Sequence, residues 1–278
     1  MQHLPDGLQS ILDYLLERRG FDFSGCRPAM LERRISQRLS AVACRDFAEY
    51  LAFIRNSSAE IDKLLSAITI SVSRFFRDPL TFELLAGRIL PAIIQEKART
   101  QDRSLRIWSA GCATGEEPYS VAILITELLE KEDLALNLHI FATDIDALVL
   151  ADAVKATYSR ESIANVQYRL VDKYFSPIGE NFRLIPIIRD KVSFSHYDML
   201  DKKHRVPPAS IFGDFDLVLC RNLLIYFNSD YQETIFAKLN QALATKGCLV
   251  LGETEAPSAT YQKHFSRFLD FSPIYMKI

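Results

Sequence analysis

The chain has 278 residues, of which 49% are hydrophobic and 24% are charged, and its formal net charge is −2. This composition is typical of a globular protein and speaks against a disordered chain or a general preference for nucleic acid. No apolar run approaches the roughly 20 residues of a membrane span, and the N-terminus lacks a signal-peptide pattern. Five scattered cysteines without a CxxC pair fit reduced thiols, so we expect a cytoplasmic protein that is not membrane-embedded. The histidines form no HExxH pattern, and no metal site is expected.

Helical periodicity dominates the first part of the chain. Apolar residues recur at helical spacing in four segments, at 8–19, 30–42, 47–55 and 59–68. Pro28 suits the first turn of the second of these helices. We therefore predict a small all-helical domain at residues 1–88 and a second domain at residues 89–278.

From about Leu105, short apolar runs alternate with helical stretches. Strands are predicted at 105–110, 136–144, 191–198, 215–222 and 247–255, and helices at 118–131, 146–158 and 229–244. Such alternation implies right-handed crossovers and a mainly parallel sheet. The last nine residues are predicted to form a final strand, at an edge of the sheet or antiparallel. A small hairpin insertion is predicted at about 176–191, where Gly179 separates two β-like pieces.

The loop after the first predicted strand reads WSAGCATGEEPYS, Trp108–Ser120. Its glycines, Gly111 and Gly115, do not have the GxGxxG spacing, and no GK[ST] follows, which disfavours an NAD-dependent oxidoreductase and a P-loop. Glu116 and Glu117 would repel a phosphate but suit a ligand with a cationic or hydroxyl-rich face, such as S-adenosylmethionine (SAM). A plain strand-to-helix turn with an acidic first turn explains the same residues. The loop alone leaves both interpretations open.

Polar residues also follow two other predicted strands. Asp144 ends the second strand, where a carboxylate can accept hydrogen bonds from both ribose hydroxyls of an adenosine ligand. Its alternative is an N-cap for the next helix, a role that Asp146 also suits. Arg221 and Asn222 end the fourth strand, and their alternative is to brace a loop. Because parallel strands end at one edge of a sheet, these side chains are predicted to converge with Gly111.

Together these motifs resemble the chemotaxis receptor methyltransferases, the CheR family. The matching stretches follow the family order and are SRFFRD (73–78), WSAGCATGEEPYS (108–120), FATDID (141–146), FDLVLCRNLLIYF (215–227) and GCLVLGETE (247–255). The resemblance implies an α/β fold: a Rossmann-like class I SAM methyltransferase domain with an N-terminal all-helical domain and a small β-hairpin insertion. It also implies methyl transfer from SAM to glutamate side chains of chemoreceptors, the methyl-accepting chemotaxis proteins. The products would be glutamate methyl esters and S-adenosylhomocysteine.

The resemblance assigns cofactor contacts to individual residues. Ser71 and Ser73 stand where the family usually has Asn and Thr, and Asp198 stands where it commonly has Asn near the adenine. Asp cannot donate the bond that Asn could, although it can accept one from the adenine amino group. The implied cofactor-binding residues are Ser71, Ser73, Arg77, Gly111, Glu117, Asp144, Asp198, Met199, Arg221 and Asn222.

Two residues are implied to be catalytic. Arg77 is the candidate for holding one oxygen of the substrate carboxylate with its planar guanidinium, and Tyr226 for orienting the same group. The alternatives are a structural salt bridge for Arg77, with Asp78 as a partner, and a half-buried aromatic ring for Tyr226.

The helical domain carries a candidate docking surface. Arg34 and Arg38 share one face of their predicted helix, and glutamate-rich receptor helices would be attracted to them. An ordinary solvated helix face explains this spacing equally well. Because the predicted insertion is short and keeps one glycine, Gly179, we expect no dependence on a tethering peptide from a receptor C-terminus.

Two other functions stay open. The first is a SAM methyltransferase that acts on another protein or on a small molecule. The second is a SAM-binding regulatory module without catalysis, which the serines at 71 and 73 would suit. The presence of Arg77, Arg221, Asn222 and Tyr226 argues against the second function.

Overall fold

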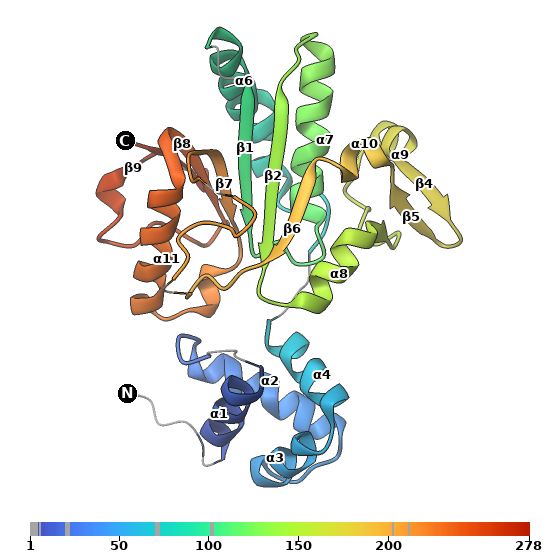
Figure 1. Cartoon of the computed structure of the whole chain (residues 1–278), viewed down its shortest axis with the longest axis vertical. Helices are drawn as coiled ribbons and strands as arrows, with labels where there is room; N and C mark the ends of the chain where they lie inside the picture. Colours follow the sequence, from blue (N-terminus) through green and yellow to red (C-terminus); the bar gives the residue numbers. More distant parts are fainter. Residues whose placement is uncertain are drawn as a thin grey trace. The chain divides into compact units, whose positions relative to one another are not determined.

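The computed structural model of the chain describes residues 5, 7–19, 23–69, 73–100, 103–201, 203–210 and 212–278 (Figure 1). The chain divides into two compact units. The helical unit comprises Met1–Ser71 and Ile225–Gln232, and the sheet unit comprises Val72–Leu224 and Glu233–Ile278. The chain therefore leaves the sheet unit once, for eight residues of the helical unit, before it returns.

In the described part of residues 1–71, four helices confirm the four helical patterns in the sequence: α1 (Leu8–Arg19), α2 (Pro28–Ala41), α3 (Phe47–Arg55) and α4 (Ser58–Thr69). Pro28 occupies the first turn of α2, and the side chain of Asp46 caps α3 by accepting a hydrogen bond from the Glu49 amide at 2.8 Å. The apolar faces form one core, in which Tyr50 and Leu64 are fully buried.

The sheet unit is built on a seven-stranded sheet in the order β6-β2-β1-β7-β8-β10-β9. The first five strands of this order are parallel, and β10 is antiparallel to both of its neighbours. Their bounds are β1 (Ser104–Ala110), β2 (Asn137–Asp144), β6 (Val192–His196), β7 (Phe215–Cys220), β8 (Leu243–Leu251), β9 (Phe265–Arg267) and β10 (Ile274–Lys277). The predicted fold class is confirmed. The final strand is antiparallel as expected and lies between β8 and β9.

Helices pack on both faces of this sheet (Figure 1). They are α5 (Pro79–Leu84), the π-helix η1 (Leu85–Ile89), α6 (Leu90–Arg99), α7 (Glu116–Lys131), α8 (Ala147–Lys155) and α11 (Ser229–Ala242). Phe82, Leu85 and Ile94 of the first three are buried in the core of the sheet unit. The compact units accordingly divide between residues 71 and 72, earlier in the chain than the expected boundary at 88.

A second, smaller sheet has the order β3-β5-β4. Its strands are β3 (Thr157–Tyr158), β4 (Phe175–Ile178) and β5 (Asn181–Leu184), with α9 (Tyr168–Tyr174) before β4 and α10 (Pro186–Arg189) after β5. The hairpin β4–β5 is the predicted insertion, and Gly179 in its turn has a φ of +58°, which favours glycine. β3 adds a third strand that the sequence did not predict.

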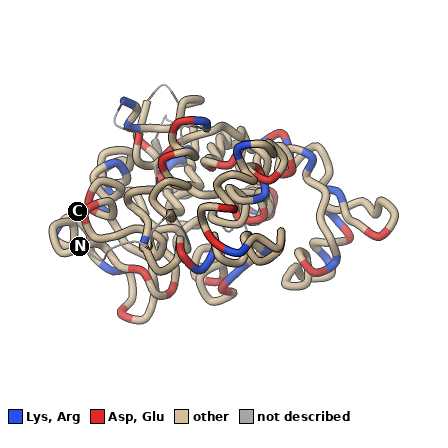
Figure 2. The backbone as a smooth tube through the Cα atoms, turned by 90° about the horizontal axis from the view of Figure 1, so that it is seen from below, with Lys and Arg blue, Asp and Glu red and all other residues tan. Residues whose placement is uncertain are grey.

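Two short 3₁₀ segments, η2 (Leu224–Tyr226) and η3 (Gln262–His264), complete the elements of the described chain. Lys and Arg are interspersed with Asp and Glu along the backbone (Figure 2). None of the helices in the described ranges is both long and apolar enough to cross a membrane.

Candidate functional site

The predicted strand-end residues lie at one edge of the large sheet. β1 ends at Ala110, which is paired with Thr143 of β2, and β7 ends at Cys220, which is paired with Leu251 of β8. Since β2, β1, β7 and β8 are neighbouring parallel strands, the residues that follow them emerge together. Gly111, Asp144, Arg221 and Asn222 are therefore gathered at this carboxyl edge, as the sequence predicted.

The loop after β1 takes a backbone path that requires glycine. Gly111 and Gly115 have φ values of +73° and +91°. The amide of Gly111 donates to the Thr143 carbonyl at 2.8 Å, which ties the loop to β2. A Cβ on Gly115 would lie 3.1 Å from the side chains of Ala153 and Tyr158, so the loop also packs too closely there for a side chain.

The carboxylate of Asp144, at the carboxyl edge of the sheet, is held by two backbone amides. Its Oδ2 accepts from the Ala113 amide at 2.9 Å, and its Oδ1 accepts from the Asp146 amide at 3.0 Å. Burial raises the pKa of Asp144, although these amides act against the increase. Asp146 caps α8 by accepting from the Leu148 amide at 2.8 Å. The N-cap role therefore belongs to Asp146, and Asp144 is left at the edge of the sheet.

The two acids at the start of α7 have different partners. Glu116 is buried, which raises its pKa, while hydrogen bonds from Thr114 and Ser73 act in the opposite direction. Glu117 accepts from the hydroxyl of Ser109 on β1 at 2.7 Å and from Arg221 at 3.1 Å. Ser73, a predicted cofactor contact, thus lies against Glu116, and Glu117 lies against the ends of β1 and β7.

The side chain of Arg221 is buried, at 2% exposed, and it binds several groups of the site. Its Nη2 donates to the Asp78 carboxylate and to the Arg77 carbonyl, both at 2.7 Å, and Nη1 donates to Glu117. Its guanidinium lies 5.3 Å from the centre of the Phe82 ring. Arg221 therefore has the bracing role that the sequence left open, and its direct approach to a ligand stays a prediction.

The segment Ser73–Asp78 approaches the edge in a strained conformation. Phe76 and Asp78 have φ values of +52° and +60°. A non-glycine residue in this region costs on the order of 1–3 kcal/mol, and such residues cluster at functional sites. The Phe76 amide is held by the hydroxyl of Ser120 on α7 at 3.0 Å. Arg77 thus lies between two strained residues, and Asp78, its suggested salt-bridge partner, pairs with Arg221.

Asp198 and Met199 follow β6, the neighbour of β2, at the same edge. The Tyr197 amide donates to the Asp144 carbonyl at 2.9 Å, which fixes this turn next to the predicted ribose site. The Asp198 carboxylate accepts from the Leu200 amide at 2.7 Å, and Met199 is buried.

The other predicted residues belong to the helical unit or lie outside the described residues. Ser71 is outside the described residues. Tyr226 ends η2 and belongs to the helical unit, as do Arg34 and Arg38 on α2. Arg38 donates to both oxygens of the buried Glu60, at 2.7 and 2.8 Å, so its charge is engaged in an internal ion pair.

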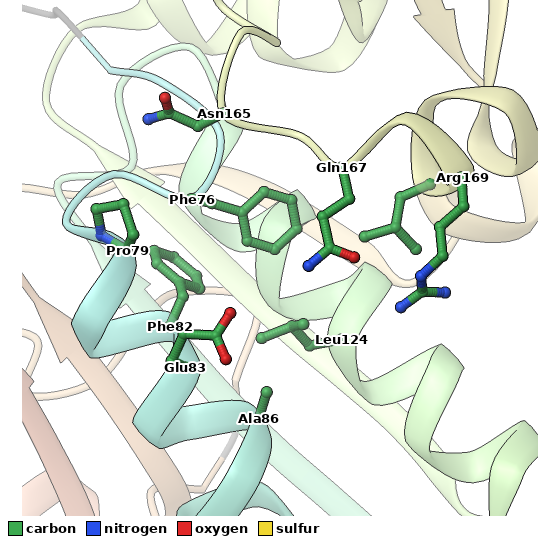
Figure 3. Close-up of a pocket in the computed structure, with 10 residues that line it drawn as sticks. Phe76, Pro79, Phe82, Glu83, Ala86, Leu124, Asn165, Gln167 and Arg169 are labelled. Atoms are coloured by element: carbon green, nitrogen blue, oxygen red, sulfur yellow. The ribbon is translucent and has the colours of Figure 1, made fainter.

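A cavity of about 240 Å³ lies beside the strained segment (Figure 3). Its walls include Phe76 and Phe82, and the Glu83 side chain points toward Leu124 and Gln167. None of the strand-end residues of the carboxyl edge lines it. The cavity therefore shares aromatic walls with the site but does not contain its polar residues.

The polar groups of the carboxyl edge fit an adenosyl cofactor better than a phosphate. Glu117, Asp144 and Asp198 supply carboxylate acceptors for ammonium and hydroxyl groups. Arg221 Nε is buried without a hydrogen-bond partner among the described residues, which leaves one donor available there. Together with the parallel strands and the antiparallel β10, these acceptors favour a SAM-dependent methyltransferase domain. No group of three or more potential metal ligands occurs in the described part of the chain.

Comparisons with known proteins identify the family. The model for the CheR methyltransferase all-alpha domain matches residues 6–69, and the model for the CheR methyltransferase SAM binding domain matches residues 71–269. The chain therefore belongs to the CheR methyltransferase family, as the sequence motifs predicted, and it is a SAM-dependent methyltransferase.

Several named relatives are similar over most of this chain. The chemotaxis protein methyltransferase of Borreliella burgdorferi is 30% identical, over 90% of this chain and 88% of the relative. That of Salmonella typhimurium is 31% identical, over 88% and 82%. A Pseudomonas aeruginosa protein named "Probable biofilm formation methyltransferase WspC" is 32% identical over 87% of this chain, but the match spans 55% of that longer protein.

Sequence reasoning missed one residue of this site. Glu255, in the stretch after β8, is a buried carboxylate whose Oε2 accepts from the amide of Asn222 at 2.9 Å. The signal in the sequence is the acidic GETE run that directly follows an apolar strand.

Proposed function

We propose that this enzyme transfers methyl groups from SAM to glutamate side chains in the cytoplasmic domains of chemoreceptors or related signalling receptors. The products are glutamate methyl esters and S-adenosylhomocysteine. The observation that carries this proposal is the joint match to both CheR domains, with relatives named chemotaxis protein methyltransferases at 30% and 31% identity. A cytoplasmic location follows from these substrates.

Methyl transfer to a carboxylate requires that the two reacting groups are positioned correctly, and it does not require a general base. A glutamate side chain is already ionised at neutral pH, and the bound cofactor supplies a methyl group on a positively charged sulfur. The protein must align the carboxylate oxygen and keep water away. Glu117 and Asp144 are proposed to hold the ammonium and ribose groups of the cofactor, and Met199 to pack on the adenine.

Arg77 is proposed to hold the substrate carboxylate. Arg221 is already shared between Asp78 and Glu117, so its charge is balanced within the site. Arg77 belongs to the strained segment, and its carbonyl accepts a hydrogen bond from Arg221. Its planar guanidinium group can bind a carboxylate. Tyr226 is proposed to orient the same group. Arg77→Ala should lower kcat far more than the affinity for SAM, and an equal loss in both would remove this role.

Docking of the receptor is proposed to use α2. Arg34 and Arg38 lie on this helix, but Arg38 is neutralised by Glu60. We therefore expect Arg34→Glu to raise the KM for receptor more than Arg38→Gln does, with the exposed Arg33→Ala as a control. We also propose that no receptor pentapeptide is needed as a tether, and micromolar binding of such a peptide in calorimetry would contradict this.

Incubation with methyl-labelled SAM and receptor-bearing membranes tests the proposed function. Glutamate methyl esters release volatile methanol in mild alkali, whereas N-methyl groups do not. Alkali-labile label on the receptor is the expected result. Alkali-stable label would indicate another substrate class, and SAM binding without transfer would indicate a regulatory module.

A further inference from the structure

Glu255 joins the ends of two neighbouring strands at the site. Its Oε2 accepts from the Gly252 amide at 2.7 Å and from the Asn222 amide at 2.9 Å. The Glu255 amide donates back to the Gly252 carbonyl at 2.9 Å, which closes a tight turn after β8. One buried oxygen therefore links the residue that follows β8 with the predicted cofactor residue that follows β7.

The link holds Asn222 in a left-handed backbone conformation, which asparagine adopts more readily than most other residues with a side chain. Its φ is +57°, in the left-handed region that is unfavourable for a side chain with a Cβ. A bond from its amide to an anionic acceptor is a strong, charge-assisted interaction that holds this conformation. The rotamers open to the Asn222 side chain depend on these backbone angles, so a bond that holds the backbone also limits where the side-chain amide can lie.

Gly252 completes the arrangement through its missing side chain. A Cβ at this position would lie 2.7 Å from Glu255 Oε2, 2.9 Å from the Asn222 amide nitrogen and 2.9 Å from Asn222 Nδ2. The side-chain amide of Asn222 therefore packs directly against the backbone of Gly252. Strand β8 contributes to the site through this contact and through Glu255.

We propose that Glu255 is a positioning residue that holds Asn222 in the conformation required for cofactor binding. It acts through Asn222 and does not need to touch the cofactor or the substrate. The inference rests on the proposed function only in assigning Asn222 to the cofactor. It adds a residue to the site that the sequence motifs did not assign a role.

The test compares the affinity for S-adenosylhomocysteine, measured by calorimetry on the full-length protein. Glu255→Ala and Asn222→Ala should each weaken binding about tenfold, corresponding to about one hydrogen-bonded contact. The double variant should be no weaker than Asn222→Ala alone, because Glu255 acts through Asn222. Glu255→Gln, which keeps an acceptor oxygen, should recover most of the affinity. The matched control is Glu253→Ala, an exposed acid in the same stretch.

Three results would overturn the inference. The first is an unchanged affinity for S-adenosylhomocysteine in Asn222→Ala. The second is a loss of affinity in the double variant that equals the product of the two single losses. The third is a loss of affinity in Glu255→Gln as large as that in Glu255→Ala. Thermal unfolding without ligand checks that each variant is folded. If Glu255→Ala does not fold, Glu255→Met fills the same space without an acceptor, and the same comparisons apply. Because binding is measured without a receptor, failure of receptor methylation would leave this test intact.

Discussion

Arg221 joins three segments that lie far apart in the sequence: the strained segment Ser73–Asp78, the start of α7 and the end of β7. Its guanidinium balances the carboxylates of Asp78 and Glu117 in a buried setting. Arg221→Ala should lower the free energy of unfolding by about 3–5 kcal/mol, because it leaves two acids without their partner. Urea unfolding, followed by circular dichroism, measures this loss.

A matched control is available within the same segment. Arg74 pairs with Glu161, but these side chains are 53% and 77% exposed. Arg74→Ala should therefore cost less than about 1 kcal/mol. Similar losses of unfolding free energy in Arg74→Ala and Arg221→Ala would contradict the conclusion that Arg221 stabilises the fold through its buried ion pairs.

At the residue scale, the sequence was informative wherever a functional side chain follows its own strand. Gly111 and Asp144 come directly after apolar runs, so their place at the edge could be predicted. The partners of these residues could not be predicted in the same way. Asp78 lies 143 positions from Arg221, and Glu255 lies 33 positions from Asn222. Such pairs depend on how strands are ordered in the sheet, which local periodicity does not contain.

Within the helical unit, the segment before α2 holds the segment that carries Tyr226. The Arg27 amide donates to the Tyr226 carbonyl at 3.0 Å, and the Asn228 amide donates to the Gly25 carbonyl at 2.8 Å. The ring of Tyr231 packs on Gly25 so closely that a Cβ there would lie 2.6 Å from the ring. These contacts fix the backbone on which Tyr226 stands.

Gly25→Val should therefore displace Tyr231 and disturb the backbone at Tyr226. We expect a stability loss of about 1–3 kcal/mol from overpacking and a fall in kcat that exceeds the change in SAM affinity. Gly87→Ala is the control, since a Cβ there meets nothing within 4 Å and alanine favours a helix. Normal kcat in a folded Gly25→Val variant would show that this packing does not position Tyr226.

The elements differ in how well the sequence predicted them. The strands β1, β2 and β7 are long apolar runs, and their predicted ranges agree closely with the structure. β3 and β9 have two and three residues, which is too short for an alternating pattern to appear. Residues 79–99 form helices whose apolar side chains lie in the core of the sheet unit, and a helical pattern does not show which of two cores receives it. That is why the expected domain boundary at 88 differs from the division of the compact units.

A cluster of charges links α7 to α9. Although partial burial acts against ionisation, hydrogen bonds from Lys173, Tyr174 and Arg169 lower the pKa of Glu127 to about 2. An unfolded glutamate has a pKa of about 4.3, so the folded state favours the ionised form. This contribution to stability is present above about pH 4.3 and is lost as the pH falls toward 2.

Glu127→Gln should consequently be less stable than wild type at pH 7, and the difference should shrink as the pH falls below about 4.3. Urea unfolding at about pH 7, 4 and 3, within the range where the carboxyl group titrates, measures the free energy difference between the two proteins. Asp152→Asn, which removes an exposed i,i+3 pair with Lys155, is the control and should show little difference at any pH. A difference for Glu127→Gln that grows on acidification would contradict the assigned pKa.

At the scale of the whole molecule, the two units have separate cores. The helical unit holds Tyr226 and the docking candidates on α2, whereas every described cofactor candidate belongs to the sheet unit. The proposed cofactor contacts, and Arg77 as the proposed contact to the substrate carboxylate, thus belong to the sheet unit, and the proposed docking residues belong to the helical unit. The segment Ile225–Gln232, which follows the end of β7 in the chain, belongs to the helical unit.

This division predicts where a bound cofactor stabilises the protein. S-adenosylhomocysteine at 100 times its Kd should stabilise the binding-competent state by about 2.7 kcal/mol. The cofactor should therefore slow amide hydrogen exchange in β1, β2 and β7, whose amides exchange through opening of the sheet unit. Hydrogen exchange with mass spectrometry measures these rates. Exchange in α1 and α3 should change little, because their core contains no predicted cofactor residue. Homocysteine alone is the control ligand, and equal slowing in α1, α3 and the strands would show that the two cores open together.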